Sequence, residues 1–263
     1  MTTAWSLPAG SGDRWVDDYE RGRPGYPAQV IDVLRLPRTA TVLDLGAGTG
    51  KLTRLLVRAF DRVIAVEPAA AMARTLVARC PEAEVLDGTA EAIPLPDGAA
   101  DAVFVAEAFH RFHARRAVAE IARVLRPPGM LVAMWNLPAR PWDPPIADVE
   151  DLLTSRIPSD AELGYDPLDL NTHRYASGEW RRAFHGSTFD ELQEVTLRNE
   201  QTLDRDGLVA FFASMGWLAD LADAQRLPLL EQVRSLLEDR DYRREWETHL
   251  YWTRLKPTPR QAA

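Results

Sequence analysis

The 263-residue sequence contains one cysteine, Cys80, and therefore lacks the means to build a disulfide framework within the chain. This cysteine usage suits a reducing compartment, so we expect a cytoplasmic protein. The sequence is also short of basic charge, with a net charge of -8 and an isoelectric point near 5.2. Phosphate backbones bind to basic surfaces, and we therefore expect no nucleic-acid partner.

Long apolar runs are absent as well, since no run approaches the length of a membrane span. The first residues lack the basic and then apolar segments of a secretion signal, and we expect no membrane partner. A metal spacing is also missing. His110 and His113 lie close together in the sequence without the acidic residue and third ligand of a zinc site, so we expect no metal.

The most informative stretch that is present runs from residue 42 to residue 53. A short apolar run leads into glycines at alternate positions, Gly46, Gly48 and Gly50, and an amphipathic pattern follows. This order predicts a strand, a tight turn and a helix. Such glycines let a nucleotide-like ligand lie against the backbone from Gly46 through Ala47 to Gly48 at the start of the helix. The alternative is a tight turn without a ligand.

The charge beside this turn separates two kinds of ligand. Dinucleotide-binding turns follow a Gly-x-Gly-x-x-Gly pattern, whereas this chain has Gly-x-Gly-x-Gly with Asp44 two positions before the first glycine. An acid there would repel a pyrophosphate and attract the ammonium group of a nucleoside that carries an amino acid. The stretch closely resembles motif I of class I S-adenosylmethionine-dependent methyltransferases. That resemblance implies S-adenosyl-L-methionine as the cofactor.

From residue 40 onward, strand and helix patterns alternate, which predicts an α/β fold. We expect a doubly wound, Rossmann-like sheet of seven strands, with the last strand antiparallel and helices on both faces. Loops that follow parallel strands then meet at one edge of the sheet, where ligands bind. The predicted strands cover residues 41–45, 62–66, 83–87, 102–105, 130–135, 191–202 and 246–255, and the predicted helices cover 15–23, 27–36, 51–60, 70–79, 114–125, 146–156, 204–215 and 228–238.

The chain divides into four predicted parts. Residues 1–38 form an N-terminal helical segment, 39–135 the cofactor-binding core, 136–188 an insertion, and 189–263 the completion of the sheet. The insertion is rich in proline and too long for a connecting loop, so we interpret it as a lid over the substrate. Basic residues gather in it and could attract an anionic small molecule, although a solvated lid surface is the commoner explanation for such residues: His173, Arg174, Arg181, Arg182 and His185.

A second acid, Glu67, ends the second predicted strand about 20 residues after the glycine turn, the spacing at which an acid bonds ribose hydroxyls. It could instead cap the following helix. The segment Val-Glu-Pro-Ala-Ala-Ala-Met resembles the second motif of the same family. The resemblance implies that Glu67 binds the ribose, with Pro68 beside it and Met72 as an apolar wall for the adenine.

The loop after the third predicted strand resembles the family loop that holds the adenine. This assigns Thr89, Ala90 and Glu91 to the cofactor site, although many relatives carry Asp where this chain has Thr89. Near the N-terminus, the pattern Tyr-x-x-x-Arg-Pro-x-Tyr-Pro resembles a subfamily that includes trans-aconitate methyltransferase-like proteins. The resemblance places Tyr19 and Arg23 near the methionine end of the cofactor, whereas simple packing is the alternative.

The loop after the fourth predicted strand is similar to the subfamily sequence Ala-Phe-His-Trp-Phe, with Arg111 in place of the tryptophan. Such a loop lies beside the transferable methyl group, which places Ala106 at the cofactor. A histidine with a near-neutral pKa can take a proton from a substrate hydroxyl, so His110 is a candidate base; bracing of the loop is the other interpretation.

The chain is thus identified by resemblance as a member of the class I methyltransferases, with a methyltransferase type 11 domain. This implies methyl transfer from S-adenosylmethionine to an oxygen, nitrogen or carbon atom of a small molecule. Two other classes share parts of the pattern. An NAD-dependent oxidoreductase would need the other glycine spacing, and a non-catalytic nucleoside-binding protein would keep the same pocket.

Overall fold

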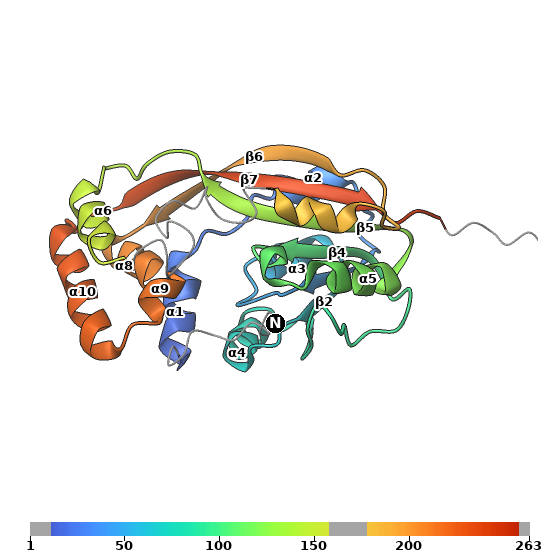
Figure 1. Ribbon diagram of the computed structural model, residues 1–263, viewed down its shortest axis with the longest axis horizontal. Helices are drawn as coiled ribbons and strands as arrows, with labels where there is room; N and C mark the ends of the chain where they lie inside the picture. The colour runs from blue at the N-terminus through green and yellow to red at the C-terminus, as the bar shows by residue number, and fades with distance from the viewer. Residues whose placement is uncertain (1–11, 158–177, 258–263) are drawn as a thin grey trace, which may run out of the picture.

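The structure is a computed structural model that describes residues 12–157 and 178–257 (Figure 1). It contains one seven-stranded sheet with the strand order β3-β2-β1-β4-β5-β7-β6. The strands are β1 (Thr41–Leu45), β2 (Arg62–Val66), β3 (Glu84–Leu86), β4 (Ala100–Ala106), β5 (Leu125–Pro138), β6 (Gln193–Leu203) and β7 (Tyr242–Arg254). The first five strands pair in parallel, whereas β7 pairs antiparallel with both β5 and β6. The predicted fold class is confirmed.

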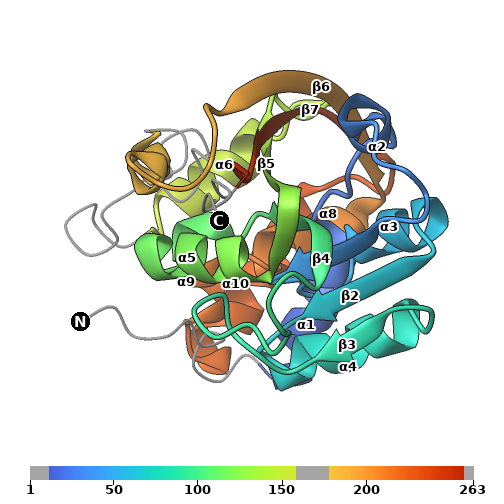
Figure 2. The ribbon, with the colours of Figure 1, turned by 90° about the vertical axis from the view of Figure 1, so that its right-hand side faces the viewer.

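Helices cover both faces of the parallel part of the sheet. The helices are α1 (Gly12–Gly22), α2 (Gln29–Leu34), α3 (Thr53–Ala59), α4 (Ala70–Arg79), α5 (Ala114–Val124), α6 (Ala147–Thr154), α8 (Arg205–Ala213), α9 (Gly216–Ala219) and α10 (Asp223–Leu236), with short 3-10 turns η1 (Phe109–Arg111) and η2 (Glu179–Phe184). Helices α2 and α3 pack on one face of the sheet, while α5 and η2 pack on the other (Figure 2).

Strand alternation explains these two layers. In β1, Val42 packs with α2 and α3, whereas Leu43 and Leu45 pack with α5. Successive side chains of a strand point to opposite faces, so a run that is apolar at nearly every position forms a strand buried on both sides. Because β1 pairs in parallel with β2 and with β4, the carboxyl ends of these three strands lie at the same edge of the sheet.

A second cluster of buried side chains lies beyond that edge. Strands β5, β6 and β7 are longer than the others and extend toward helices α6, α8 and α10, at the left of Figure 1. Trp142, Phe211, Trp246 and Leu218 are buried together there. The cluster also includes Phe212, Met215 and Trp217.

Several element boundaries differ from the predicted ones. The fifth strand begins at Leu125 because Leu125 pairs with Ala100 before a break in the register. The last helix begins at Asp223, five residues before the predicted start at Pro228, and it carries the proline inside. Proline is tolerated in a helix where the loss of one backbone hydrogen bond is offset by packing, and Leu229 and Val233 of this helix are buried.

Only parts of the predicted lid, residues 136–188, belong to the described chain. Helix α6 packs into the second cluster, and η2 packs against α5 and β5. Arg181 pairs with Glu194, with 2.7 Å between Nη2 and Oε2, and its guanidinium lies over the Tyr251 ring. Residues 158–177, with His173 and Arg174 of the predicted basic cluster, lie outside the described residues.

Candidate active site

A cavity of about 360 Å³ lies between helix α1 and the carboxyl ends of β1, β2, β3 and β4. This volume falls within the range of small-molecule sites. Ten residues predicted to bind a cofactor line it: Tyr19, Gly46, Gly48, Glu67, Pro68, Met72, Thr89, Ala90, Glu91 and Ala106. Trp15, Glu107, Arg111, Phe112, His113 and Arg116 line it as well. Four predicted residues, Arg23, Asp44, Ala47 and His110, are not among the lining residues.

The glycine turn forms the floor of the cavity. Gly46 and Gly48 have φ angles of 73° and 60°, in the region that favours glycine. The backbone N–H groups of Gly46 and Ala47 both donate to the carbonyl oxygen of Val66, which ties the turn to the end of β2. A Cβ atom at Gly46 would lie 2.9 Å from the Cβ atom of Ala108. The sequence therefore needs glycine at position 46 to bring the turn against the loop after β4.

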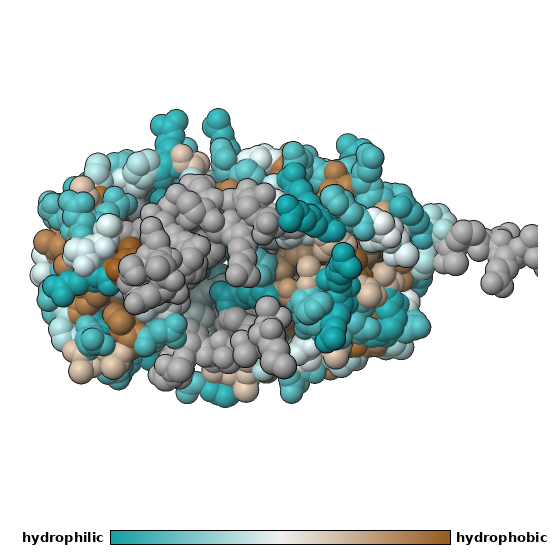
Figure 3. Space-filling view, in the orientation of Figure 1, coloured by the Kyte–Doolittle hydropathy of each residue, from teal (hydrophilic) through white to brown (hydrophobic). Residues whose placement is uncertain are grey.

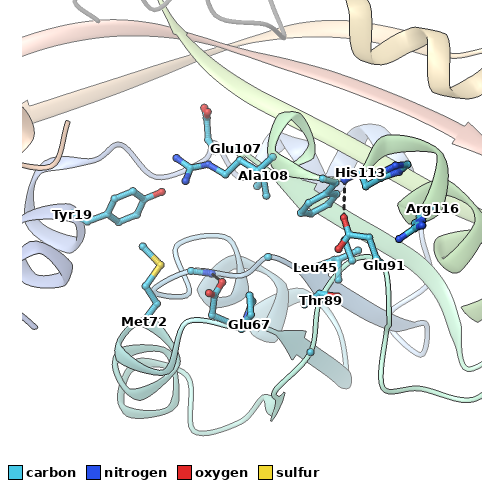
Figure 4. Close-up of a pocket in the computed structure, with 18 of the residues that line it drawn as sticks. Tyr19, Leu45, Glu67, Met72, Thr89, Glu91, Glu107, Ala108, His113 and Arg116 are labelled. Carbon is cyan, nitrogen blue, oxygen red and sulfur yellow. Dashed lines mark hydrogen bonds between the residues drawn. The ribbon is translucent and has the colours of Figure 1, made fainter. Parts of the chain in front are cut away.

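Glu67 lies at the centre of this floor (Figure 4). Its Oε2 accepts a hydrogen bond from the backbone N–H of Gly48, and its Oε1 accepts one from the backbone N–H of Ala69, each at 2.8 Å. The second bond is the helix-capping interaction that the sequence left open. Burial nevertheless raises the pKa of the carboxyl above its usual value. Each carboxylate oxygen has a further lone pair, so Glu67 can cap α4 and still accept hydrogen bonds from a ligand in the cavity.

Asp44 lies behind the glycine turn and is 1% exposed. Its Oδ2 accepts a hydrogen bond of 2.6 Å from the Thr53 hydroxyl at the start of α3. Burial is the main cause that raises the pKa of Asp44 to about 7. The described role of this acid is to join β1 to α3, and its predicted contact with a ligand ammonium group stays a prediction.

Because Asp44 is buried, we expect it to make the free energy of unfolding depend on pH. The variant Asp44→Asn should lack this contribution, since asparagine does not titrate. Because its pKa is higher in the folded protein than in the unfolded chain, Asp44 stabilises the fold below about pH 4, and this contribution disappears as pH rises through about 7. The free energy of unfolding of Asp44→Asn, minus that of the wild type, should therefore increase as pH rises across this window. The increase should be at most about 1.4 kcal/mol per pH unit. Urea unfolding of both proteins at pH 5 and pH 8 measures the difference, and parallel pH curves would show that Asp44 stays ionised in the fold.

The loop after β3 forms another wall of the cavity. Thr89 and Ala92 form an isolated antiparallel bridge, so the loop folds back on itself. The Glu91 carboxylate accepts a hydrogen bond of 2.7 Å from the backbone N–H of His113 (Figure 4). This bond joins the loop to the segment after β4. Met72 of α4 lies across the cavity, with its thioether directed toward Tyr19 (Figure 4).

Helix α1 closes the cavity on the remaining side. The Tyr19 hydroxyl points into the cavity, and the ring of Tyr19 packs on Trp15, with 5.4 Å between the ring centroids (Figure 4). Glu20 attaches the helix to the glycine turn, because its carboxylate accepts a hydrogen bond of 2.6 Å from the Thr49 hydroxyl and pairs with Arg54 at 2.9 Å. Tyr19 therefore lines the cavity, and its predicted place at the methionine end of a cofactor stays a prediction.

Arg23 directly follows helix α1 and contacts Ser214 and the ring of Phe211. Its Nε donates to the Ser214 hydroxyl at 2.8 Å, and its guanidinium lies 5.3 Å from the centroid of the Phe211 ring. This arrangement joins the end of α1 to the second cluster. The predicted contact of Arg23 with a cofactor is not tested by these contacts.

The loop after β4 differs most from the sequence interpretation. The predicted base His110 accepts a hydrogen bond at Nδ1 from the indole N–H of Trp135, at 3.5 Å, and is not among the residues that line the cavity. Glu107 lines the cavity instead, at a position the sequence interpretation did not single out. The available signal was positional, because Glu107 directly follows the fourth strand at the ligand edge. Arg111, which replaces a family tryptophan, also lines the cavity.

The two ends of the cavity differ in the side chains that line them. The carboxylate of Glu67, the glycine backbone and an apolar wall occupy one end, while Tyr19, Glu107 and Arg111 occupy the other.

Within residues 12–157 and 178–257, no group of three or more His, Cys, Asp or Glu side chains comes together as a metal site. In the same described residues, the helices do not reach the combination of length and apolar character needed to cross a bilayer. The face in Figure 3 is mostly hydrophilic.

Known proteins resemble this chain in sequence. A family model described as a methyltransferase domain matches residues 43–133, which include the glycine turn, Glu67 and the loop after β4. An uncharacterised methyltransferase of Mycobacterium tuberculosis is 52% identical over 132 residues, which make up 50% of this chain and 53% of that protein. The chain therefore spans about half the length of such curated relatives. An uncharacterised methyltransferase-like protein of Schizosaccharomyces pombe is 29% identical over 231 residues, covering 85% of this chain and 83% of that protein.

Solved structures agree with the fold. A proposed type II methyltransferase from Anaeromyxobacter dehalogenans superposes with a TM-score of 0.64 at 24% sequence identity, covering 90% of this chain and 99% of the other. At this identity the likeness supports the architecture, including the part of the chain beyond the matched family region.

Proposed function

We propose that this chain, which belongs to the class I S-adenosylmethionine-dependent methyltransferases, binds S-adenosylmethionine in the described cavity and methylates an oxygen, nitrogen or carbon atom of a small molecule. The observation that carries the proposal is Glu67, held at the end of β2 by the amides of Gly48 and Ala69 with its carboxylate on the cavity. A fixed acid in that position suits a pair of ribose hydroxyls.

In this proposal, different lining residues contact different parts of the cofactor. Glu67 accepts the ribose hydroxyls, and Met72 with Pro68 covers one side of the adenine. Thr89, Ala90 and Glu91 border the adenine edge, while Gly46, Gly48, Ala106 and Tyr19 border the methionine part. Ala47, Asp44 and Arg23 would act through the turn and through helix α1, because their described contacts lie within the protein.

When bound, the cofactor would supply a methyl group on a positively charged sulfur. The residues of the chain then have to hold the acceptor in line with that methyl group and exclude water, because orientation is the main source of acceleration in such displacements. Helix α1 serves this purpose through the Glu20 contacts to the glycine turn and through the bond from Trp15 to the Ser214 carbonyl oxygen. The predicted lid would complete the enclosure.

Methyl transfer itself tests the proposal. The full chain is incubated with S-adenosylmethionine carrying a labelled methyl group and with a library of small metabolites. Labelled product together with S-adenosylhomocysteine is expected, and heat-denatured protein serves as the control. Binding of S-adenosylhomocysteine without any labelled product would leave the non-catalytic nucleoside-binding alternative instead.

A further inference from the structure

Glu107 occupies the point where β4 ends and the chain turns into the cavity wall. Its backbone N–H donates to the Met134 carbonyl oxygen at 2.9 Å, and its φ angle is 54°, in the region that residues other than glycine rarely adopt. A non-glycine residue keeps this conformation only where its surroundings fix it. In this conformation Glu107 lines the cavity.

One hydrogen bond holds the carboxylate of Glu107, and two more fix the side chain of Asn136, the residue that donates it. The backbone N–H of Asn136 in β5 donates to Oε1 of Glu107 at 2.5 Å. The side-chain amide of Asn136 donates to the Gly25 carbonyl oxygen at 3.0 Å and accepts from the Thr248 hydroxyl at 2.6 Å. Strand β5 therefore holds Oε1 of Glu107 through Asn136, whose side chain is fixed in turn by β7 and by the segment after α1.

The position of Glu107 separates it from the nucleoside end of the cavity. Figure 4 shows Glu67 and Met72 on one side of the cavity and Glu107 on the opposite side, beyond the Tyr19 hydroxyl. The charged and titratable groups that face Glu107 are Tyr19 and Arg23 from the α1 side and Arg111 from η1. The competing base candidate, His110, accepts a hydrogen bond from Trp135 and does not line the cavity.

We propose that Glu107 is a catalytic residue that receives the proton of the methyl acceptor, and that the acceptor is consequently a hydroxyl or amine compound rather than a carboxylate. The inference rests on the proposed methyltransferase function and names the substrate class of the same site. A carboxylate acceptor would meet the carboxylate of Glu107 at the reacting position, where like charges repel in a partly desolvated site. A hydroxyl or an ammonium group has a proton to give to it.

The chemical step balances without a further reagent. An oxygen lone pair of the acceptor forms the new bond to the methyl carbon, the carbon–sulfur bond breaks, and its electron pair stays on sulfur to give neutral S-adenosylhomocysteine. The acceptor proton passes to Oε2 of Glu107, which later releases it to water. For an amine, Glu107 removes the proton from the ammonium form first, so that the nitrogen lone pair can attack.

The protonation of Glu107 fits this task. Burial, the largest cause, raises the pKa of its carboxyl to about 7, against the opposing effects of the Asn136 hydrogen bond and of Arg23 and Arg111. A base with a pKa near the working pH combines a substantial ionised fraction with a useful proton affinity. Turnover should therefore fall as pH falls below about 7, because the protonated carboxyl can no longer accept a proton.

The test compares Glu107→Gln with wild type on acceptors grouped in triplets, such as 3-phenylpropanol, 3-phenylpropylamine and 3-phenylpropanoate, with labelled S-adenosylmethionine. Glutamine keeps the shape and can still accept the Asn136 hydrogen bond, but it cannot take a proton. We expect label in hydroxyl or amine members, in a form stable to mild alkali, and a loss of turnover of about 10²- to 10⁴-fold in Glu107→Gln. The acid limb of the wild-type pH profile near 7 should disappear in the variant.

The control variant is Glu84→Gln, an exposed acid of β3 outside the cavity, which should keep wild-type turnover. Calorimetry with S-adenosylhomocysteine should give the same affinity for wild type and Glu107→Gln within about twofold. A loss of that affinity with unchanged turnover would make Glu107 a cofactor ligand and overturn the inference. Equal turnover at equal affinity would overturn it too.

Two product outcomes separate the inference from the proposed function. Label in carboxylate members that mild alkali releases as methanol would keep the transferase function and overturn the acceptor class. Absence of label from every member, with S-adenosylhomocysteine still bound, would remove the transferase function and the inference with it.

Discussion

Replacing Gly50 by alanine is expected to lower the free energy of unfolding by about 2 to 5 kcal/mol. Two costs add up at this position. Gly50 has a φ angle of 86°, and an L-residue in the left-handed region costs roughly 1–2 kcal/mol. An added Cβ would also lie 2.6 Å from Cδ1 of Leu76 and 3.0 Å from Sγ of Cys80, both fully buried, and overpacking of this kind costs about 1–3 kcal/mol.

Gly98→Ala is the matched control for this prediction. Gly98 has a φ angle of 63°, but an added Cβ there has no atom within 4 Å. Its alanine variant should therefore show the backbone cost alone, about 1–2 kcal/mol. Urea unfolding of both variants measures the difference. Equal losses at the two positions would show that the glycine turn does not need to approach α4 closely.

Glu67→Ala should weaken the binding of S-adenosylhomocysteine by about 1.5 to 3 kcal/mol, or roughly 10- to 150-fold, because hydrogen bonds to a charged acceptor contribute on this scale. The carboxylate is 4% exposed and lies at the cavity floor. Its loss removes the proposed acceptor of both ribose hydroxyls. It also leaves the amides of Gly48 and Ala69 without their described partner.

The second effect has to be separated from the first. Glu67→Gln keeps an oxygen that can accept from one of the two amides, so it should retain more stability than Glu67→Ala while losing the charge. Thermal unfolding without ligand reports the structural loss, and calorimetry with S-adenosylhomocysteine reports the binding loss. Unchanged ligand affinity in Glu67→Ala would leave Glu67 with a structural role alone, through its hydrogen bonds from Gly48 and Ala69.

The sequence predicts the parallel half of the fold closely because its strands are buried on both faces. The predicted strands 41–45 and 62–66 and the predicted helix 70–79 have the observed bounds. Near-continuous apolar runs bounded by glycine and proline leave little freedom in such segments. The glycine turn and Glu67 also follow from spacing alone, since both depend on local backbone geometry.

The extended half of the sheet was less predictable. Strand β5 runs to Pro138 because Asn136, Leu137 and Pro138 pair with residues of β7 that lie more than 100 positions later. Helix α10 includes Pro228 because its buried residues pack on α8 and α6. Long-range pairing and packing override local propensity here, and no local pattern carries that information.

The candidate site shows the same division. The position of Glu107 directly after the fourth strand could be read from the sequence, whereas its positive φ angle and its hydrogen bond from Asn136 of β5 could not. His110 was chosen for its residue type. Its hydrogen bond to Trp135 of β5 depends on the pairing of β4 with β5 and cannot be read from the loop sequence.

The most direct test of the central claim is isothermal titration of the full chain with S-adenosylhomocysteine and, separately, with NAD. We expect binding of S-adenosylhomocysteine that weakens in Glu67→Ala, and no binding of NAD, because the turn from Gly46 to Gly50 lacks the spacing that accommodates a pyrophosphate. Binding of NAD with no response to S-adenosylhomocysteine would contradict the account and favour an oxidoreductase.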